Sequence, residues 1–305
     1  MQLSRRSLLL AAAFRTWGQE AKFSVGVDVV TLLATVRNRD GAIVKDLTRD
    51  DFSLLDDGVP QTIRYFTRES DLPLTIGLLV DTSRSQTGVL EPERRASYAF
   101  LDHMLREGTD QASIVSFDTK VNVLQSLTSS RRDLAVALNQ LAIPRQLATL
   151  IYSAIRETAE DIMRPRQGRK AFILLSDGFA YRDPTTLETA IEYAQRADTL
   201  IYSIRFSDHP KFYRPGRAAV QVLTSERGKK ALERLSRETG GGYFEVSKTD
   251  SIESIYGRIE EALRTQYSIG YTPEGRRSAG KYHKVKLTAR QRDLIVITRD
   301  GYYAK

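Results

Sequence analysis

The chain has 305 residues, of which 41% are hydrophobic and 28% are charged, enough to bury one large core and a second small one. It contains no cysteine, which excludes disulfides, thiolate zinc sites and cysteine nucleophiles. The formal net charge is +8, but the 46 basic and 38 acidic residues are scattered and form no arginine-rich arm. We therefore expect no binding to nucleic acid.

Residues 1–22 resemble an export signal. A charged start with Arg5 and Arg6 precedes a short apolar run over residues 8–14, as in signals of the twin-arginine pathway. Arg15 interrupts this run and no small-x-small cleavage pattern follows, so a start that is not cleaved or that is simply disordered stays an alternative. No other stretch approaches the ~18 apolar residues that a membrane span requires. We expect a periplasmic or secreted protein, with a cytoplasmic location as the alternative.

Residues 23–70 form an all-β block. The segment 25–36 is rich in β-branched residues, and turn signals follow at residues 38–41 and 56–58. No convincing helix is predicted in this block.

Residues 71–265 alternate strand-like runs with amphipathic helices, which is typical of a parallel sheet covered on both faces. We expect strands at 74–80, 112–117, 171–175, 199–206 and 242–246, an antiparallel edge strand at 120–126, and helices from about 92 and at 130–142, 149–163, 185–197, 226–239 and 250–265. This order predicts an α/β domain with a doubly wound, six-stranded, mostly parallel sheet.

Residues 266–305 return to β patterns, with strands expected at 267–271, 282–288 and 294–298. This block and the block at 23–70 each have too few strands to bury a stable core alone. We therefore expect the two blocks to pair into one small β-sandwich, with the α/β domain at 71–265 inserted into it.

Two polar loops follow buried strands of the α/β domain, at residues 81–85 and 176–178. The carboxyl ends of parallel strands share one edge of an open sheet, and ligands bind there. Alternate residues of an extended loop point the same way, so that Asp81, Ser83 and Ser85 can converge on one ion. Their oxygens are hard donors, which select Mg²⁺, Mn²⁺ or Ca²⁺ over zinc or copper. Ordinary helix caps and turns are the alternative interpretation.

The order of D-x-S-x-S, a later Thr and a later Asp resembles the metal-ion-dependent adhesion site (MIDAS) of the von Willebrand factor type A (VWA) family. The resemblance assigns the metal ligands to Asp81, Ser83, Ser85, Thr149 and Asp177. It also implies a Rossmann-like fold, inserted into a sandwich as in integrin β-subunit I-like domains, and covers nearly the whole chain after residue 22. The family often has Gly-Gly before the Thr and Leu-Tyr-Asp after it, and residues 147–153 depart from this pattern.

In the VWA family the hydroxyls contact the ion, the two aspartates lie near it, and an acidic side chain of a protein partner completes its ligands. The resemblance therefore implies a metal-dependent protein-binding or adhesion module of bacterial type that is not an enzyme. Mg²⁺ is the expected ion, with Mn²⁺ or Ca²⁺ as alternatives, while the partner and the oligomeric state stay open. A basic rim is expected to steer acidic partners toward the site, formed by Arg84, Arg182, Lys211, Arg214 and Arg217.

Two other functions stay open. An aspartate beside Mg²⁺ at the end of a buried strand is also how aspartate-nucleophile phosphatases are built, which would make the protein a Mg-dependent phosphohydrolase. Those enzymes have a second carboxylate two residues later, where this chain has Ser83, which argues against catalysis. A structural envelope protein with an unused metal site is the third interpretation. We expect His103, His209 and His283 to be structural or solvated, because no metal-binding pattern accompanies them.

Overall fold

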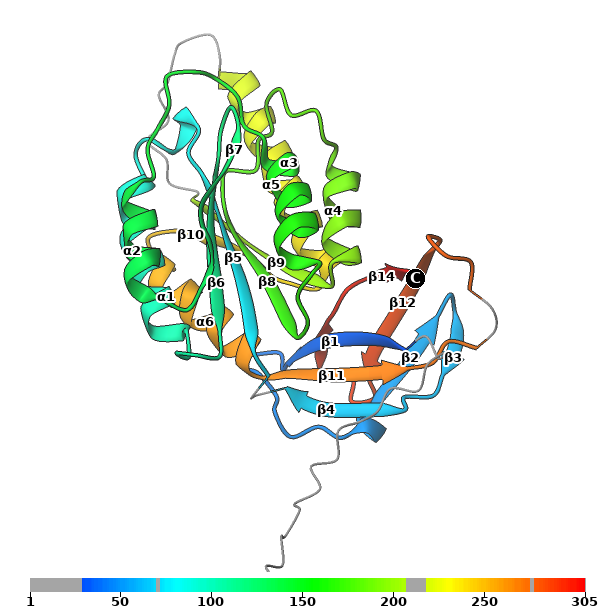
Figure 1. Ribbon diagram of the computed structural model, residues 1–305. Helices are drawn as coiled ribbons and strands as arrows, with labels where there is room; N and C mark the ends of the chain where they lie inside the picture. Colours follow the sequence, from blue (N-terminus) through cyan, green and yellow to red (C-terminus); the bar gives the residue numbers. More distant parts are fainter. Residues whose placement is uncertain (1–28, 70–71, 207–217, 275–276, 305) are drawn as a thin grey trace, which may run out of the picture.

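The computed structural model describes residues 29–69, 72–206, 218–274 and 277–304. These residues form an α/β part with helices on both faces of a central sheet, and a β-sandwich at one end of it (Figure 1). Within the described ranges, none of the helices combines the length and the apolar character that a membrane span needs.

The central sheet has six strands in the order β10-β9-β8-β5-β6-β7. Their bounds are β5 (Leu74–Asp81), β6 (Gln111–Phe117), β7 (Val121–Thr128), β8 (Arg169–Leu175), β9 (Thr199–Phe206) and β10 (Tyr243–Val246). All neighbours are parallel except β7, which lies antiparallel at the edge beside β6. The predicted six-stranded, mostly parallel sheet is confirmed.

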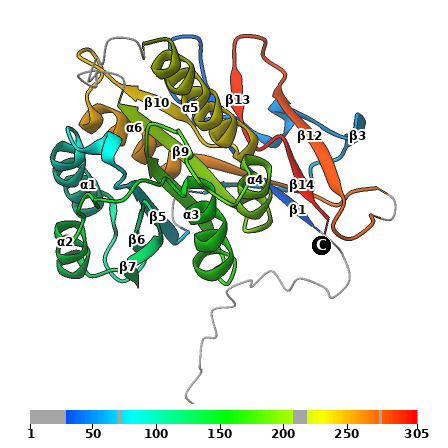
Figure 2. The same ribbon diagram turned by 90° about the horizontal axis from the view of Figure 1, so that it is seen from above.

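Six helices of the described residues cover this sheet: α1 (Leu90–Met104), α2 (Arg131–Asn139), α3 (Ile151–Thr158, extended by a π-helical turn at Ala159–Met163), α4 (Leu187–Arg196), α5 (Ala218–Thr239) and α6 (Ile252–Arg264). The helices α1, α2 and α6 pack on one face, and α3, α4 and α5 on the other (Figure 2). Because side chains of a strand alternate between faces, Leu78 enters the first core and Leu79 the second. The helix α5 begins earlier than residue 226, where we expected it.

The β-sandwich consists of two four-stranded sheets, β13-β1-β11-β4 and β14-β12-β2-β3. Its strands are β1 (Val30–Arg37), β2 (Phe52–Asp56), β3 (Val59–Gln61), β4 (Tyr65–Glu69), β11 (Gln266–Tyr271), β12 (Tyr282–Ala289), β13 (Ile295–Ile297) and β14 (Gly301–Tyr303). Each sheet combines strands from both ends of the chain, so the predicted pairing of the two all-β blocks is confirmed. The short 3-10 helix at Arg49–Asp51 and the strand β14 were not predicted.

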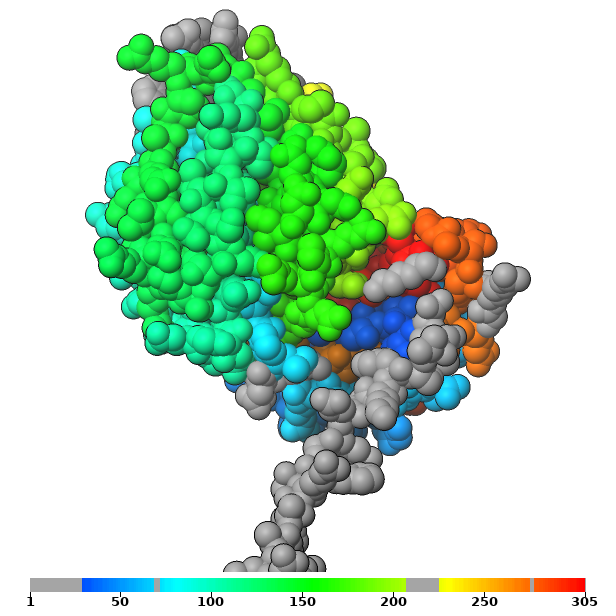
Figure 3. All heavy atoms as spheres, in the orientation of Figure 1, coloured from blue at the N-terminus to red at the C-terminus, as the bar shows by residue number. Residues whose placement is uncertain are grey.

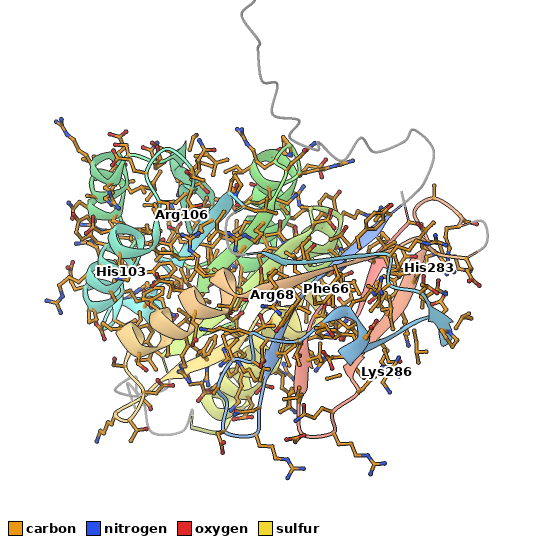
Figure 4. All side chains as sticks on the ribbon, turned by 90° about the horizontal axis from the view of Figure 1, so that it is seen from below. Phe66, Arg68, His103, Arg106, His283 and Lys286 are labelled. Atoms are coloured by element: carbon orange, nitrogen blue, oxygen red, sulfur yellow. The ribbon has the colours of Figure 1, made fainter. Side chains whose placement is uncertain are left out.

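Aromatic rings fill the centre of the sandwich. Phe66, labelled in Figure 4, has its ring centroid 5.8 Å from that of Phe52 and 5.6 Å from that of Tyr267. The buried hydroxyl of Tyr267 donates a hydrogen bond to the carbonyl of Val44, at 2.9 Å, and accepts one from the amide of Leu47. Tyr267 is therefore a core residue, with its ring against Phe66 and its hydroxyl fully hydrogen-bonded to the backbone.

The α/β part is inserted into the sandwich at neighbouring points. Glu69, at the end of β4, and Gln266, at the start of β11, are partners in the antiparallel pair of these strands. Figure 3 shows the α/β part directly against the sandwich, where Arg299 pairs with Asp198 at 2.8 Å. The strand β5 runs away from this junction, which places its carboxyl end at the opposite end of the molecule (Figure 1). We propose residues 71–265 as the bounds of the inserted domain.

Candidate metal site

Asp81, the last residue of β5, is fully buried and joins two loops. One carboxylate oxygen accepts a hydrogen bond from the backbone amide of Ser83 at 2.8 Å, and the other accepts one from the hydroxyl of Ser176 at 2.6 Å. Burial and the nearby charge of Asp177 raise the pKa of Asp81 to about 7, against the hydrogen bonds that lower it. The ionised form of Asp81 therefore lacks a compensating positive charge.

The two serines of the first loop face each other. The hydroxyl oxygens of Ser83 and Ser85 lie 3.0 Å apart, on or beside a short 3-10 helix at Arg84–Gln86. Ser83 is buried and Ser85 is exposed, so that the pair spans from the interior to the surface. The structure brings these two hydroxyls together through a 3-10 turn rather than through the extended loop that we expected.

Backbone contacts hold Thr149 beside the second loop. Its amide and carbonyl both bond to Tyr181, at 2.9 and 3.1 Å, in an isolated antiparallel bridge. The next amide, of Leu150, donates to the carbonyl of Asp118, whose carboxylate accepts a hydrogen bond from the Thr82 hydroxyl at 2.7 Å. These bonds connect four loops at the carboxyl edge of the sheet, those that carry Thr82, Asp118, Thr149 and Tyr181.

Asp177 lies in the loop after β8, partly exposed, and one of its oxygens accepts a hydrogen bond from the amide of Phe179 at 2.9 Å. The following residue, Gly178, has a φ of +81° and faces α5, where a Cβ would lie 2.3 Å from the carbonyl oxygen of Gly228. Only glycine fits both the left-handed conformation and this close approach. The Ser-Asp-Gly turn is thereby fixed against α5.

A third carboxylate, Glu93 of α1, follows the first loop, and we did not expect it from the sequence. Its side chain is 1% exposed, and burial and the charges of Asp81 and Asp177 raise its pKa well above the usual value. Within the described ranges, no ion pair involves Asp81, Glu93 or Asp177. Carboxylates and hydroxyls without a protein cation are a donor set that fits a divalent cation.

The predicted basic rim is only partly described. Arg84 is exposed within the first loop. Arg182 is exposed, has a φ of +58° and lies with its guanidinium 5.3 Å from the ring centroid of Tyr181. Lys211, Arg214 and Arg217 lie outside the described residues.

A second group of potential ligands, Asp56, Asp57 and His283, has ligand atoms within 4.8 Å of one another. It lies in the sandwich, at the other side of the molecule from His103 on α1 (Figure 4). The guanidinium of Arg277 already pairs with both carboxylates, at 2.9 and 3.5 Å. The positive charge of Arg277 therefore already compensates these carboxylates, and the group fits a structural role. Such a role agrees with our expectation that His283 is structural or solvated. His209 lies outside the described residues.

The family model of the von Willebrand factor type A domain matches residues 76–179. This segment contains β5, the D-x-S-x-S loop, Thr149 and Asp177. Residues 76–179 are therefore similar to the von Willebrand factor type A domain.

Solved structures share this fold at low sequence identity. Proximal thread matrix protein 1 from the mussel byssus, in a structure with a zinc-occupied MIDAS motif, is 14% identical with a TM-score of 0.52, and the match covers 68% of this chain and 50% of that chain. Another structure of that mussel protein gives 15% identity and a TM-score of 0.51, with 68% and 51% covered. This chain thus spans about half the length of the mussel protein.

A third similar structure is the vWF domain of the type V pili tip protein Mfa5 from Porphyromonas gingivalis, at 13% identity and a TM-score of 0.48, with 63% of this chain and 95% of that chain covered. No curated protein matches the sequence of this chain. The likeness to solved structures supports the fold alone.

Proposed function

We propose that this protein is a divalent-metal-dependent protein-binding module. The cation would lie at the carboxyl edge of the central sheet, with ligands from three loops: Asp81, Ser83, Ser85, Thr149 and Asp177. The observation that carries the proposal is the fully buried carboxylate of Asp81, which is bonded to the first loop and to Ser176 but pairs with no cationic side chain in the described ranges. A bound cation would supply the missing positive charge.

The hydroxyl ligands and the carboxylate ligands would have different roles. The hydroxyls of Ser83, Ser85 and Thr149 would bind the cation as neutral oxygens, while Asp81 and Asp177 would hold its remaining water molecules. Mostly neutral ligands leave the ion incompletely neutralised, and the bound cation then attracts a carboxylate of a partner protein. Mg²⁺ fits such a hydrated site, and Mn²⁺ or Ca²⁺ are the alternatives.

Partner and location belong to the same proposal. The partner would be a protein with an exposed acidic side chain, and exposed Arg84 and Arg182 would favour its approach. A location outside the cytoplasm is supported by the signal-like residues 1–22, which lie outside the described residues. A basic rim with Lys211, Arg214 and Arg217 stays a prediction.

Pull-down from the native envelope fraction, with Mg²⁺ and then with EDTA, tests this function. We expect the wild type to capture a partner only with Mg²⁺, and the variant Ser83→Ala to capture none under either condition. Equal capture in EDTA would contradict the proposal.

The phosphohydrolase alternative is weakened by Ser83, whose hydroxyl pairs with that of Ser85 where such an enzyme would need a carboxylic acid. An assay of a simple phosphomonoester with and without Mg²⁺ discriminates the two functions. We expect no turnover in either condition, whereas turnover that depends on both Mg²⁺ and Asp81 would establish the enzyme.

A further inference from the structure

Glu93 is an acidic residue on the buried face of a helix. It lies in the first turns of α1, and the residues three, four and seven positions later, Ala96, Ser97 and Phe100, are all buried. Its side chain therefore points toward the sheet rather than into solvent. The neighbouring Arg94 is engaged elsewhere, with Glu91 and with the carbonyl of Leu141.

Neither carboxylate oxygen of Glu93 has a hydrogen-bond partner, although both are buried. The hydroxyl of Tyr256 in the facing helix α6 is already paired with that of Ser97, at 2.8 Å. A buried carboxyl group without partners is costly in either protonation state, because even the neutral acid has a hydroxyl to satisfy. Its place in the fold therefore calls for a partner such as ordered water or a cation.

The groups that affect Glu93 electrostatically are the two aspartates of the proposed metal site. The first loop leads directly into α1 through backbone hydrogen bonds, from the amide of Gln86 to the carbonyl of Ser83, from the amide of Val89 to the carbonyl of Gln86, and from the amide of Glu93 to the carbonyl of Val89. The buried carboxyl group of Glu93 therefore lies shortly after the loop that carries Ser83 and Ser85, and the charges of Asp81 and Asp177 raise its pKa. Three carboxylates gathered without a cationic side chain would repel one another, and a divalent cation is the ligand that removes this repulsion.

We infer that Glu93 is a third carboxylate of the metal site, one that accepts hydrogen bonds from water molecules retained by the cation. This inference rests on the proposed function and goes beyond the five ligands of the motif. Magnesium-like ions lose water reluctantly, and groups that hold the retained water orient the site and strengthen binding. Glu93 is then a positioning residue that raises affinity for divalent over monovalent cations.

Calorimetric titration of Mn²⁺ and Mg²⁺ into the full chain tests this role, with thermal unfolding in EDTA and at saturating Mn²⁺ as a second readout. The first variant, Glu93→Gln, keeps the shape of the side chain and removes its charge. The second, Glu93→Leu, has a similar size and removes both polar oxygens. Glu107→Gln is the matched control, because Glu107 is 86% exposed just after α1 and its replacement changes the net charge equally.

We expect both Glu93 variants to bind Mn²⁺ at least about 10-fold more weakly than the wild type and to show a smaller metal-induced rise in melting temperature. Glu107→Gln should match the wild type in both. If one variant is too unstable for calorimetry, its unfolding temperature titrated with Mn²⁺ gives the affinity instead.

The outcomes separate this inference from the function on which it rests. Wild-type affinity in the Glu93 variants would overturn the inference and leave the proposed function standing. A wild-type protein that binds neither cation would overturn both.

Discussion

Among single residues, Asp110 shows how a buried carboxylate is stabilised when both of its oxygens accept hydrogen bonds. Asp110 is fully buried and accepts hydrogen bonds from the amide of Leu74 at 2.9 Å, the amide of Arg106 at 3.0 Å and the guanidinium of Arg264 at 2.6 Å. Burial alone would raise the pKa of Asp110, but these bonds lower it to about 2. Asp110 thereby fastens the start of β5 to the ends of α1 and α6.

A depressed carboxyl pKa has a defined effect on stability. The unfolded chain binds a proton near pH 3.8 and the folded one only near pH 2, so the stabilisation by Asp110 is present above about pH 4 and is lost as the pH falls toward 2. We expect Asp110→Asn to lower the free energy of unfolding by about 2 kcal/mol at pH 7 and by much less near pH 2.

Urea unfolding of Asp110→Asn at both pH values measures this difference. Exposed Asp161, replaced in the same way, is the control and should change little. A loss of equal size at pH 2 and pH 7 would contradict the assigned role.

The turn that carries Asp177 depends on one glycine. Because Gly178 combines a positive φ with a close approach to Gly228, we expect Gly178→Ala to lower the free energy of unfolding by about 1–3 kcal/mol and to weaken Mn²⁺ binding. Gly88→Ala is the matched control near the first loop, since a Cβ there meets nothing within 4 Å. Chemical unfolding measures the free energy of unfolding of both variants, and titration measures their Mn²⁺ affinity. Equal values for Gly178→Ala and Gly88→Ala would contradict the requirement for glycine at residue 178.

At the element scale, the sequence predicted what depends on local pattern. The buried runs at 74–80 and 171–175 became β5 and β8, because strands covered on both faces have a continuous apolar sequence. The strand β14 has only three residues, too few to show a period. Pairing of particular strands across the chain, such as β1 with β11, follows from tertiary packing rather than from local pattern.

The residues of the candidate site also divide into those that local sequence pattern predicts and those that depend on tertiary packing. Asp81, Ser83, Ser85 and Asp177 could be selected because they directly follow buried strands. The bridge between Thr149 and Tyr181 joins loops that local pattern does not relate. Glu93 escaped notice because a charged residue in a helix is usually solvated, although its spacing to Ala96 and Phe100 was a usable signal.

Within the sandwich, Asp56 connects three strands. It ends β2 and accepts hydrogen bonds from the hydroxyls of Tyr271 in β11, at 3.1 Å, and Tyr302 in β14, at 3.0 Å, besides pairing with Arg277. We expect Asp56→Ala to lower the free energy of unfolding by about 3 kcal/mol, because it leaves the buried partners unpaired.

Exposed Asp50 is the control for this substitution. The Mn²⁺ affinity of Asp56→Ala should equal that of the wild type, because the sandwich lies at the opposite end from the proposed site. Weaker metal binding in the folded variant would show that Asp56 belongs to a metal site after all.

Over the whole molecule, the two parts have separate buried cores, and the chain crosses between them at one place. The cores of the α/β part and of the sandwich contain different buried residues, and the chain crosses between the parts beside the paired residues Glu69 and Gln266. This arrangement places the carboxyl edge of the central sheet, where we propose the metal site, at the opposite end of the molecule from the sandwich (Figure 1).

Separate cores predict that residues 71–265 fold alone. We expect this segment, expressed by itself, to unfold cooperatively and to bind Mn²⁺ within about threefold of the full chain, because every proposed ligand lies within it. Circular dichroism and calorimetry measure both properties. A segment that is unfolded, even at saturating Mn²⁺, would reject the proposed domain bounds.

We propose above all that the three loops with Asp81, Thr149 and Asp177 bind one divalent cation at the carboxyl edge of the central sheet. The most direct test is a calorimetric titration of Mn²⁺ into the full wild-type chain and into Ser83→Ala, with melting temperatures in EDTA to show that both are equally folded. We expect one site in the wild type and binding at least about 10-fold weaker in Ser83→Ala. Absence of binding in the wild type, or equal affinity in the two proteins, would contradict this proposal.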